Sequence, residues 1–461
     1  MSAELPADLK MGVSGVRGIV GPSFGPEQAV YLAQCFGEIM GRGRIALGRD
    51  TRTTGVVFRD AVQAGLLAAG CEVVDIGICP TPTVLLAVRS EDYVGGIVIT
   101  ASHNPPEWNG LKFVGGGGRF LTAPQAERLY EMYHRRRAQM VPWDHIKATR
   151  SKKGALEQHI AKILEAVDVE AIRAAKFKVG LDCCNGAGSL VSADLLKQLG
   201  CQIKVIHDVP NGLFPRGAEP KPENLQALGE LVRTQGLDIG FAQDPDADRL
   251  GLVIDGGTPI SEEITLALGV EGILIQSPGS VVINLSTSKA IEDIAAGYGV
   301  EIFRTPVGEA NVVDRMIQES AVVGGEGNGG IILGRINYGR DSLVGMALIL
   351  QYMALTGKKV SELVEALPQY AMIKASVQCG QNVMTRVLNV LAGEYGDHID
   401  DQSDGLRVVL ANGTWFHVRG SNTEPVMRIL VESKDGDEAG ELCDHLKARI
   451  EEAGHKQAGA G

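Results

Sequence analysis

The sequence is poor in aromatic residues, has no paired-cysteine motif and lacks any long hydrophobic run. Only 5% of the 461 residues are aromatic, whereas 59 are glycine, so an aliphatic core and frequent turns are expected. Eight cysteines form no Cys-x-x-Cys pair, and several lie in apolar runs that are typical of small core residues. No apolar run reaches the roughly 18 residues of a membrane helix, and Met1–Leu9 lacks the apolar centre of a signal peptide. We therefore expect a cytoplasmic protein with no membrane partner.

An excess of basic residues is also missing. The 44 lysines and arginines are outnumbered by 56 aspartates and glutamates, which gives a net charge of −12. This charge argues against a nucleic-acid-binding protein, whose binding domain is usually basic. It leaves room for a small anionic ligand, because a few clustered cations can reverse the local potential. We expect a small-molecule ligand and no nucleic acid.

Three segments of the chain repeat one pattern of strand, helix, glycine and strand. The first strands of the three segments are residues 45–50, 179–185 and 281–286. The helical segments are predicted over 56–69, 188–199 and 287–298, and each is followed by glycine, at Gly70, Gly200 and Gly299. Such alternation predicts βαβ units, and its recurrence indicates an internal structural repeat.

The last part of the chain, from about residue 372, has a different pattern. Short alternating strands are followed by an amphipathic helix near 438–453. The sequence therefore predicts three successive, similar α/β domains with mixed, mainly parallel sheets, then a C-terminal α+β domain, around a central cleft. The predicted domains are residues 1–150, 151–256, 257–369 and 370–461.

A candidate reactive serine follows a strand of the first repeat. Ile97–Val98–Ile99 runs into TASHNPP, which predicts a buried strand and a rigid polar loop, with Ser102 at the strand's carboxyl end, where open α/β sheets bind ligands. The Gly-x-Ser-x-Gly motif of hydrolases is absent. On an extended chain, His103 would point away from Ser102 and would be a poor base for it. A structural serine is the alternative interpretation; Lys112 is a candidate for moving protons or holding phosphate.

The second repeat carries three aspartates after a strand. Asp244, Asp246 and Asp248 lie at alternate positions of DPDADR. Carboxylates gathered in this way repel one another unless a hard divalent cation lies among them, and Mg²⁺ prefers oxygen ligands. An EF-hand is excluded, because its glycine and its final glutamate are missing. Three carboxylates leave positions for water or substrate phosphate, as in phosphoryl transfer; a solvated acidic turn is the alternative.

Three further loops are candidates for ligand binding. In GGEGNGG, residues 324–330, the glycines allow close backbone approach and Glu326 and Asn328 suit a polyol, although no phosphate-binding Gly-Lys-Ser/Thr is present. VRGSNTEP, residues 418–425, concentrates donors that suit phosphate. GVSGVRG, residues 12–18, carries Arg17. The alternatives are a flexible turn, a solvated hairpin loop and a solvated arginine.

The order of GVSGVRG, TASHNP, DPDADR, GEGNGG and RGSNTEP resembles the α-D-phosphohexomutase superfamily over nearly the whole chain. The resemblance implies a four-domain isomerase that interconverts hexose 6-phosphate and hexose 1-phosphate through phosphorylated Ser102 and a hexose 1,6-bisphosphate. It implies Mg²⁺ held by Asp244, Asp246, Asp248 and the phosphate on Ser102. It leaves open whether the protein is a monomer or a homodimer.

The resemblance also implies roles for other residues. Those expected near the reacting phosphate are Arg17, His103, Lys112 and Arg249. Those expected at the sugar hydroxyls are Glu326 and Asn328. Those expected at the substrate's other phosphate are Arg419, Ser421, Asn422 and Thr423, with Arg428 beyond them.

Two departures from the superfamily pattern bear on the substrate. Asn328 and Gly330 stand where many members have serine and histidine, and Gly420 stands where proline or alanine often follows the arginine. GEGNGG together with GRD at Gly339–Asp341 looks more like phosphoglucosamine mutases of archaeal type and their bacterial relatives, whereas the SNTEP loop is equally typical of phosphomannomutase/phosphoglucomutase enzymes. We therefore expect conversion of glucosamine 6-phosphate to glucosamine 1-phosphate, with phosphomannomutase/phosphoglucomutase as the alternative. The alternatives of another class are a sugar-phosphate-binding protein and a phosphatase.

Overall fold

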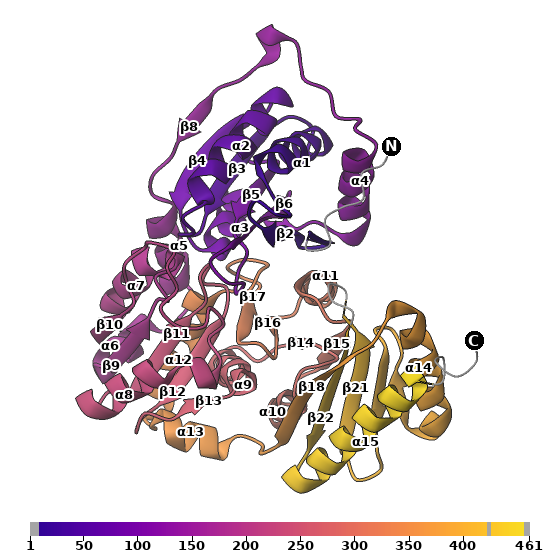
Figure 1. Ribbon diagram of the computed structural model, residues 1–461. Helices are drawn as coiled ribbons and strands as arrows, with labels where there is room; N and C mark the ends of the chain where they lie inside the picture. The colour runs from indigo at the N-terminus through magenta and orange to yellow at the C-terminus, as the bar shows by residue number, and fades with distance from the viewer. Residues whose placement is uncertain (1–8, 422–425, 456–461) are drawn as a thin grey trace.

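The computed structural model describes residues 9–421 and 426–455, which form four sheets that follow one another along the chain (Figure 1). The first sheet lies at the top of the view, the second and third lie side by side below it, and the fourth lies at the lower right. In the described ranges, every helix is too short or too polar to cross a membrane.

The first three sheets share one strand order, in which three parallel strands are followed by an antiparallel return strand. In the first sheet these are β4 (Glu72–Ile78), β3 (Arg44–Arg49), β5 (Gly95–Ile99) and β6 (Trp108–Gly115). In the second they are β10 (Gln202–Ile206), β9 (Lys178–Asp182), β11 (Ile239–Gln243) and β12 (Leu250–Ile254). In the third they are β15 (Ile302–Thr305), β14 (Val281–Asn284), β16 (Val323–Glu326) and β17 (Gly330–Leu333). The predicted repeat and fold class are confirmed.

This shared order fixes where the candidate loops lie. The serine loop joins β5 to β6, the aspartate loop joins β11 to β12, and the glycine-rich loop joins β16 to β17. Each loop therefore begins at the carboxyl end of the last parallel strand of its sheet. In such sheets this edge is the usual place for ligands.

Short strands extend the first two sheets: β1 (Lys10–Gly12), β2 (Gly15–Ile19), β7 (Arg119–Phe120), β8 (Thr149–Ser151) and β13 (Pro259–Ile260). The helices of the first sheet are α1 (Pro26–Ile39), α2 (Gly55–Ala68), α3 (Thr81–Ser90), α4 (Ala123–His134) and the 3₁₀ turn η1 (Trp143–His145). Those that follow are α5 (Ala155–Leu164), α6 (Val169–Ala175), η2 (Ala187–Leu190), α7 (Ser192–Gln198), η3 (Pro222–Asn224) and α8 (Gln226–Gln235). Those around the third sheet are α9 (Glu262–Leu274), α10 (Ala290–Tyr298), α11 (Glu309–Glu319), α12 (Ser342–Thr356) and α13 (Val360–Ala366).

The helix predicted over 188–199 is interrupted in the structure. It divides into η2 and α7, with Val191 at φ −141° between them. Gly188 packs so closely on Gln243 that a Cβ atom would lie 2.1 Å from Gln243 Oε1. This contact packs the first turn against strand β11, and the break at Val191 separates that turn from α7.

The fourth sheet is antiparallel. Its order is β18 (Ala371–Gln378), β22 (Val426–Ser433), β21 (Trp415–Gly420), β20 (Leu406–Val409) and β19 (Ile399–Asp401). The helices of this part are α14 (Gln381–Glu394), the turn η4 (Gly396–His398) and α15 (Gly436–His455), and α15 crosses the sheet face in Figure 1. The predicted α+β composition is confirmed.

One continuous hydrophobic core joins the second and third sheets. It runs from Ile160 to Leu367, with Leu86 of α3 added from the first sheet, and includes α9 and α12, which pack against each other. Helix α12 is apolar all round because it is surrounded, which explains the unbroken apolar stretch at 343–350. The largest core of the first sheet and the core of the fourth sheet are separate clusters.

Candidate active site

The serine loop has a strained backbone that hydrogen bonds hold in place. Ser102 has φ +49°, in the left-handed region that non-glycine residues rarely adopt. Its N–H donates to Thr100 Oγ1 at 2.9 Å, and the Thr100 hydroxyl donates to Asp50 Oδ2 at 2.6 Å. Its carbonyl accepts from Arg52 at 2.6 Å. The expectation of an extended chain at His103 is therefore wrong, because these bonds turn the backbone at Ser102.

The buried side chain of Arg52 holds this loop in place through hydrogen bonds to its backbone. Arg52 was not predicted from the sequence. Its side chain is fully buried and ion-pairs with Asp50 at 3.1 Å. Its guanidinium also donates to the carbonyl oxygens of Ser102, Asn104, Pro105 and Trp108, at 2.6 to 2.9 Å. The signal that could have found it is its position at the end of β3, in Gly-Arg-Asp-Thr-Arg.

We expect Arg52→Lys to lower the free energy of unfolding by about 3 kcal/mol, because a lysine ammonium cannot reproduce the guanidinium's bonds to Asp50 and four loop carbonyls at once. Chemical denaturation measures this change. The control is Arg59→Lys on α2, where the arginine pairs with Asp60 in solvent and should be replaced at little cost. Equal unfolding midpoints for the two variants would contradict the role given to Arg52.

The three aspartates are brought together by a tight turn. Ala247 has φ +54°, and oxygens of Asp244, Asp246 and Asp248 lie within 4.8 Å of one another, all buried. Asp244 Oδ2 accepts a hydrogen bond from Ser102 Oγ at 3.0 Å. The predicted reactive serine and the predicted metal ligands, 142 positions apart, are thus in direct contact.

The aspartate cluster fits a divalent cation. Within the described ranges, Asp246 Oδ1 and Asp248 Oδ1 are buried without a hydrogen-bond donor. Burial and the charges of Asp248 and Asp246 raise the pKa of Asp244 well above its ordinary value. Hard oxygen ligands and a crowded negative charge are the conditions that favour Mg²⁺.

Lys112 bridges two of the aspartates. Its Nζ lies 2.7 Å from Asp246 Oδ2 and 2.8 Å from Asp248 Oδ2. Burial works to lower the pKa of Lys112, but the two carboxylates outweigh it and raise the pKa. In this arrangement Lys112 is a fixed cation. Thr81, which the sequence did not single out, also donates to Asp246 Oδ2, at 2.6 Å.

Further cations and a histidine surround the serine. Arg249 pairs with Glu219 at 2.5 Å, and Arg17 donates to Asn104 Oδ1 at 2.9 Å. The charge of Arg249, together with burial and Arg17, holds the pKa of His103 well below its ordinary value, so its ring is neutral. All the residues expected at the reacting phosphate line one cavity of about 270 Å³: Arg17, Ser102, His103, Lys112 and Arg249.

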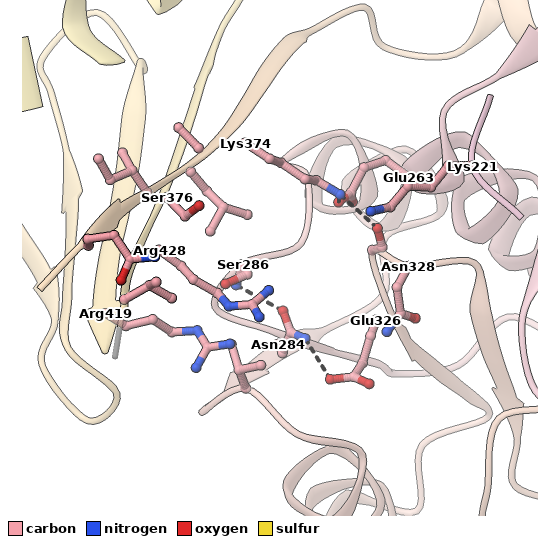
Figure 2. Close-up of a pocket in the computed structure, with 17 residues that line it drawn as sticks. Lys221, Glu263, Asn284, Ser286, Glu326, Asn328, Lys374, Ser376, Arg419 and Arg428 are labelled. Carbon is pink, nitrogen blue, oxygen red and sulfur yellow. Dashed lines mark hydrogen bonds and ion pairs between the residues drawn. The ribbon is translucent and has the colours of Figure 1, made fainter. Parts of the chain in front are cut away.

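A second cavity, of about 670 Å³, lies between the third and fourth sheets (Figure 2). Glu326 and Asn328 line both cavities, so the two spaces meet at the glycine-rich loop. In Figure 2, Arg419 and Arg428, on the paired strands β21 and β22, lie on the left of the cavity, opposite Lys221 and Asn328 on the right. Ser421 follows β21, whereas the predicted Asn422 and Thr423 lie outside the described residues.

Several lining residues were not predicted. Glu326, which was predicted, accepts hydrogen bonds from the Asn284 side chain at 3.0 Å and from the Gly308 N–H at 3.1 Å. In the second cavity the polar residues that were not predicted include Lys221, Glu263, Asn284, Ser286, Lys374 and Ser376. In the first they include Glu309 and Arg340. Arg340 belongs to the GRD motif, which bore on the substrate and gave Arg340 no role at the site; contact in space is what identifies these residues.

His417 joins the fourth sheet to the wall of this cavity. One ring nitrogen lies 2.9 Å from Ser286 Oγ and the other 2.7 Å from the Asp404 carbonyl oxygen. Burial lowers the pKa of His417 to about 4, so the folded protein holds the ring neutral at neutral pH.

We expect this histidine to make the protein less stable in acid. An unfolded histidine titrates near 6.5, so between pH 6.5 and about 4 the unfolded chain binds the proton and the folded chain does not. The stability is complete above pH 6.5 and falls as the pH drops, by up to about 1.4 kcal/mol per pH unit. Denaturation of the wild type and His417→Gln at several pH values measures the difference. Identical pH slopes would contradict the prediction.

Comparison with known proteins agrees with this geometry. Models of the phosphoglucomutase/phosphomannomutase α/β/α domains I, II and III match residues 8–140, 157–257 and 263–370, and the model of the C-terminal domain matches residues 372–449. A phosphoglucomutase/phosphomannomutase of Thermococcus kodakarensis is 37% identical over 96% of this chain and 98% of its own length. A probable phosphoglucosamine mutase of Methanopyrus kandleri is 36% identical over 94% of this chain and 96% of its own.

A solved structure agrees as well. A phosphoglucomutase/phosphomannomutase family protein of Burkholderia thailandensis superposes with a TM-score of 0.84 at 26% identity, covering 100% of this chain and 99% of the other. The resemblance drawn from the five motifs is confirmed. The chain belongs to the α-D-phosphohexomutase superfamily and is a phosphohexomutase, an isomerase similar to phosphoglucosamine mutase.

Proposed function

We propose that the enzyme interconverts hexose 6-phosphate and hexose 1-phosphate through a phosphate carried on Ser102. The observation that supports this most directly is the 3.0 Å contact between Ser102 Oγ and Asp244 Oδ2. A phosphate on this serine would lie beside the three aspartates and among Arg17, Lys112 and Arg249. Such a group of fixed cations suits a step whose main need is stabilisation of charge on the moving phosphoryl group.

The reaction is two transfers that mirror each other. In the first, the bond between phosphorus and Ser102 Oγ breaks and a bond from phosphorus to a sugar hydroxyl oxygen forms. In the net balance, the proton of that sugar hydroxyl ends on Ser102 Oγ. The product is a hexose 1,6-bisphosphate. After the bisphosphate has turned over in the cavity, its other phosphate returns to Ser102 and the isomeric monophosphate leaves. No phosphate is lost in a cycle.

Asp244, Asp246 and Asp248, with the phosphate on Ser102, would hold Mg²⁺. When bound, the cation would offset negative charge on the phosphoryl group during transfer. Lys112 holds Asp246 and Asp248 from one side. Arg249, whose backbone N–H donates to Asp244 Oδ1 at 3.1 Å, presents its side chain to the same cavity.

The second cavity suits the rest of the substrate. Glu326 and Asn328 are placed for the sugar hydroxyls, since they line both cavities. Arg419, Ser421 and Arg428, with Asn422 and Thr423 predicted for the same role, would bind the phosphate that is not reacting. A charge-assisted arginine pair suits a phosphate dianion. The sugar thus lies between two anion sites and fits in either orientation.

For the sugar itself we propose glucosamine phosphate. The Methanopyrus kandleri relative, named a probable phosphoglucosamine mutase, and Asn328 and Gly330 in the glycine-rich loop support this choice. The Thermococcus kodakarensis relative, named for glucose and mannose phosphates, supports those sugars as the second candidate.

Three measurements test the proposal. Intact mass should show one added phosphoryl group on the active protein. Parallel assays should give a higher kcat/KM for glucosamine 6-phosphate than for the mannose and glucose compounds; a much slower reaction of the amino sugar would overturn the choice of substrate. Stoichiometric release of inorganic phosphate would indicate a phosphatase and contradict the mutase cycle.

A further inference from the structure

Arg340 lines the first cavity and lies on a rigid segment. The segment joins β17 to α12, and Asp341 caps α12 by accepting from the N–H groups of Leu343 and Val344. The Asp341 N–H donates to the Ile331 carbonyl at 2.9 Å, and the Arg340 N–H donates to Glu309 Oε1 at 2.8 Å. The backbone of Arg340 is therefore fixed on both sides.

The guanidinium of Arg340 contacts three carboxylates that come from different elements. It lies 3.0 Å from Asp248 Oδ2, 3.1 Å from Glu326 Oε2 and 3.0 Å from Glu309 Oε2. Its side chain is only 10% exposed. Asp248 belongs to the aspartate loop and Glu326 ends β16, so one side chain connects the metal site to the sugar loop.

The position of Arg340 also dictates the residue at 330. A Cβ atom on Gly330 would lie 2.1 Å from Arg340 Cδ and 2.7 Å from its Cγ. These atoms are in the middle of the side chain, and the guanidinium beyond them is held by three carboxylates, so the side chain cannot move aside cheaply. Arg340 occupies the space that a side chain at 330 would need.

We propose that Arg340 is a positioning residue that couples cation binding at the aspartates to hexose phosphate binding at Glu326. This rests on the roles proposed above for Asp248 and Glu326. By binding Asp248 Oδ2, Arg340 leaves Oδ1, which is buried without a hydrogen-bond donor in the described ranges, to face the cation. By binding Glu326 Oε2 it fixes that carboxylate for the sugar. Because coupling between two sites is reciprocal, each ligand then strengthens binding of the other.

Calorimetric titration of Mg²⁺ into protein that carries no phosphate on Ser102, with and without a saturating hexose 1-phosphate, measures the coupling without turnover. In the wild type the hexose phosphate should tighten Mg²⁺ binding about tenfold. In Arg340→Met, which keeps an unbranched stem but removes the charged guanidinium, Mg²⁺ should bind more weakly and the hexose phosphate should change the Mg²⁺ affinity less than twofold. Arg315→Met, which removes an arginine paired with Glu319 on α11, should keep the wild-type coupling. Tenfold coupling in Arg340→Met, or none in the wild type, would overturn the proposal.

A pair of variants tests the steric argument, namely that Arg340 fills the space beside Gly330. This test does not require Arg340→Met to fold. Gly330→Ala in the wild type should raise the KM for hexose phosphate about tenfold or more, because the methyl group displaces Arg340. In the Arg340→Ala background the same change should alter KM less than twofold. An equal effect of Gly330→Ala in both backgrounds would contradict the packing argument. If Asp248→Asn leaves Mg²⁺ affinity unchanged, the proposed metal site fails and not the contact made by Arg340.

Discussion

Ser102→Ala should reduce kcat by about 10³-fold or more, because the variant has no oxygen to carry the phosphoryl group between the two transfers. The fold should be unaffected, since the bonds that hold the loop use the backbone N–H and carbonyl of Ser102. Steady-state assay measures the loss. Intact mass should show that the phosphoryl group found on the wild type is missing.

The matched control is Ser14→Ala. Ser14 lines the same cavity but stands outside the contact between Ser102 and the aspartates, so its removal should change kcat little. Full mutase activity in Ser102→Ala, or a phosphoryl group still bound to it, would remove this serine from the mechanism.

Asp244→Asn should lower kcat by at least about 100-fold and weaken Mg²⁺ binding. The substitution removes a carboxylate oxygen from the cluster while keeping nearly the same size. Incubation of the wild type with a chelator should abolish activity, and added Mg²⁺ should restore it. Activity assays over a range of Mg²⁺ concentrations measure both effects.

Asp194→Asn on α7 controls for the loss of one negative charge, because Asp194 is exposed and pairs only weakly with Lys197 at 3.3 Å. It should behave like the wild type. An Asp244→Asn enzyme with an unchanged Mg²⁺ requirement would show that the cation is held elsewhere. Activity that survives exhaustive chelation would contradict the use of a metal.

The features that could be predicted from the sequence are those with a local signature. The strand and helix pattern of each repeat is periodic, and a glycine after each helix marks its end, so the fold class followed from it. The aspartates share one turn, and the serine follows a clear strand. Each candidate loop could be found because its unusual residues are consecutive.

Residues that act through contacts between distant parts of the chain could not be predicted in this way. Arg340 meets Asp248 across 92 positions, and Thr81 meets Asp246 across 165. Arg52 looks like any arginine after a strand until the five acceptors of its buried guanidinium are seen. The premise of an extended chain at His103 was wrong for a related reason: the rule that side chains alternate along an extended chain does not apply where Ser102 adopts a left-handed backbone. That His103 is a poor base for Ser102 stays a prediction.

The core shared by the second and third sheets affects how the molecule unfolds. Segments that share buried contacts open as one cooperative unit, so these two sheets should unfold together. The fourth sheet has a core of its own, and the first sheet has its largest core apart and joins the shared core only through Leu86 of α3. Both outer sheets can therefore open while most of the shared core stays intact. The aspartates and Glu326 thus belong to one unit, whereas Ser102 and Arg419 belong to two others. Partial opening of an outer unit would expose the site yet leave the spacing from the aspartates to the sugar loop intact.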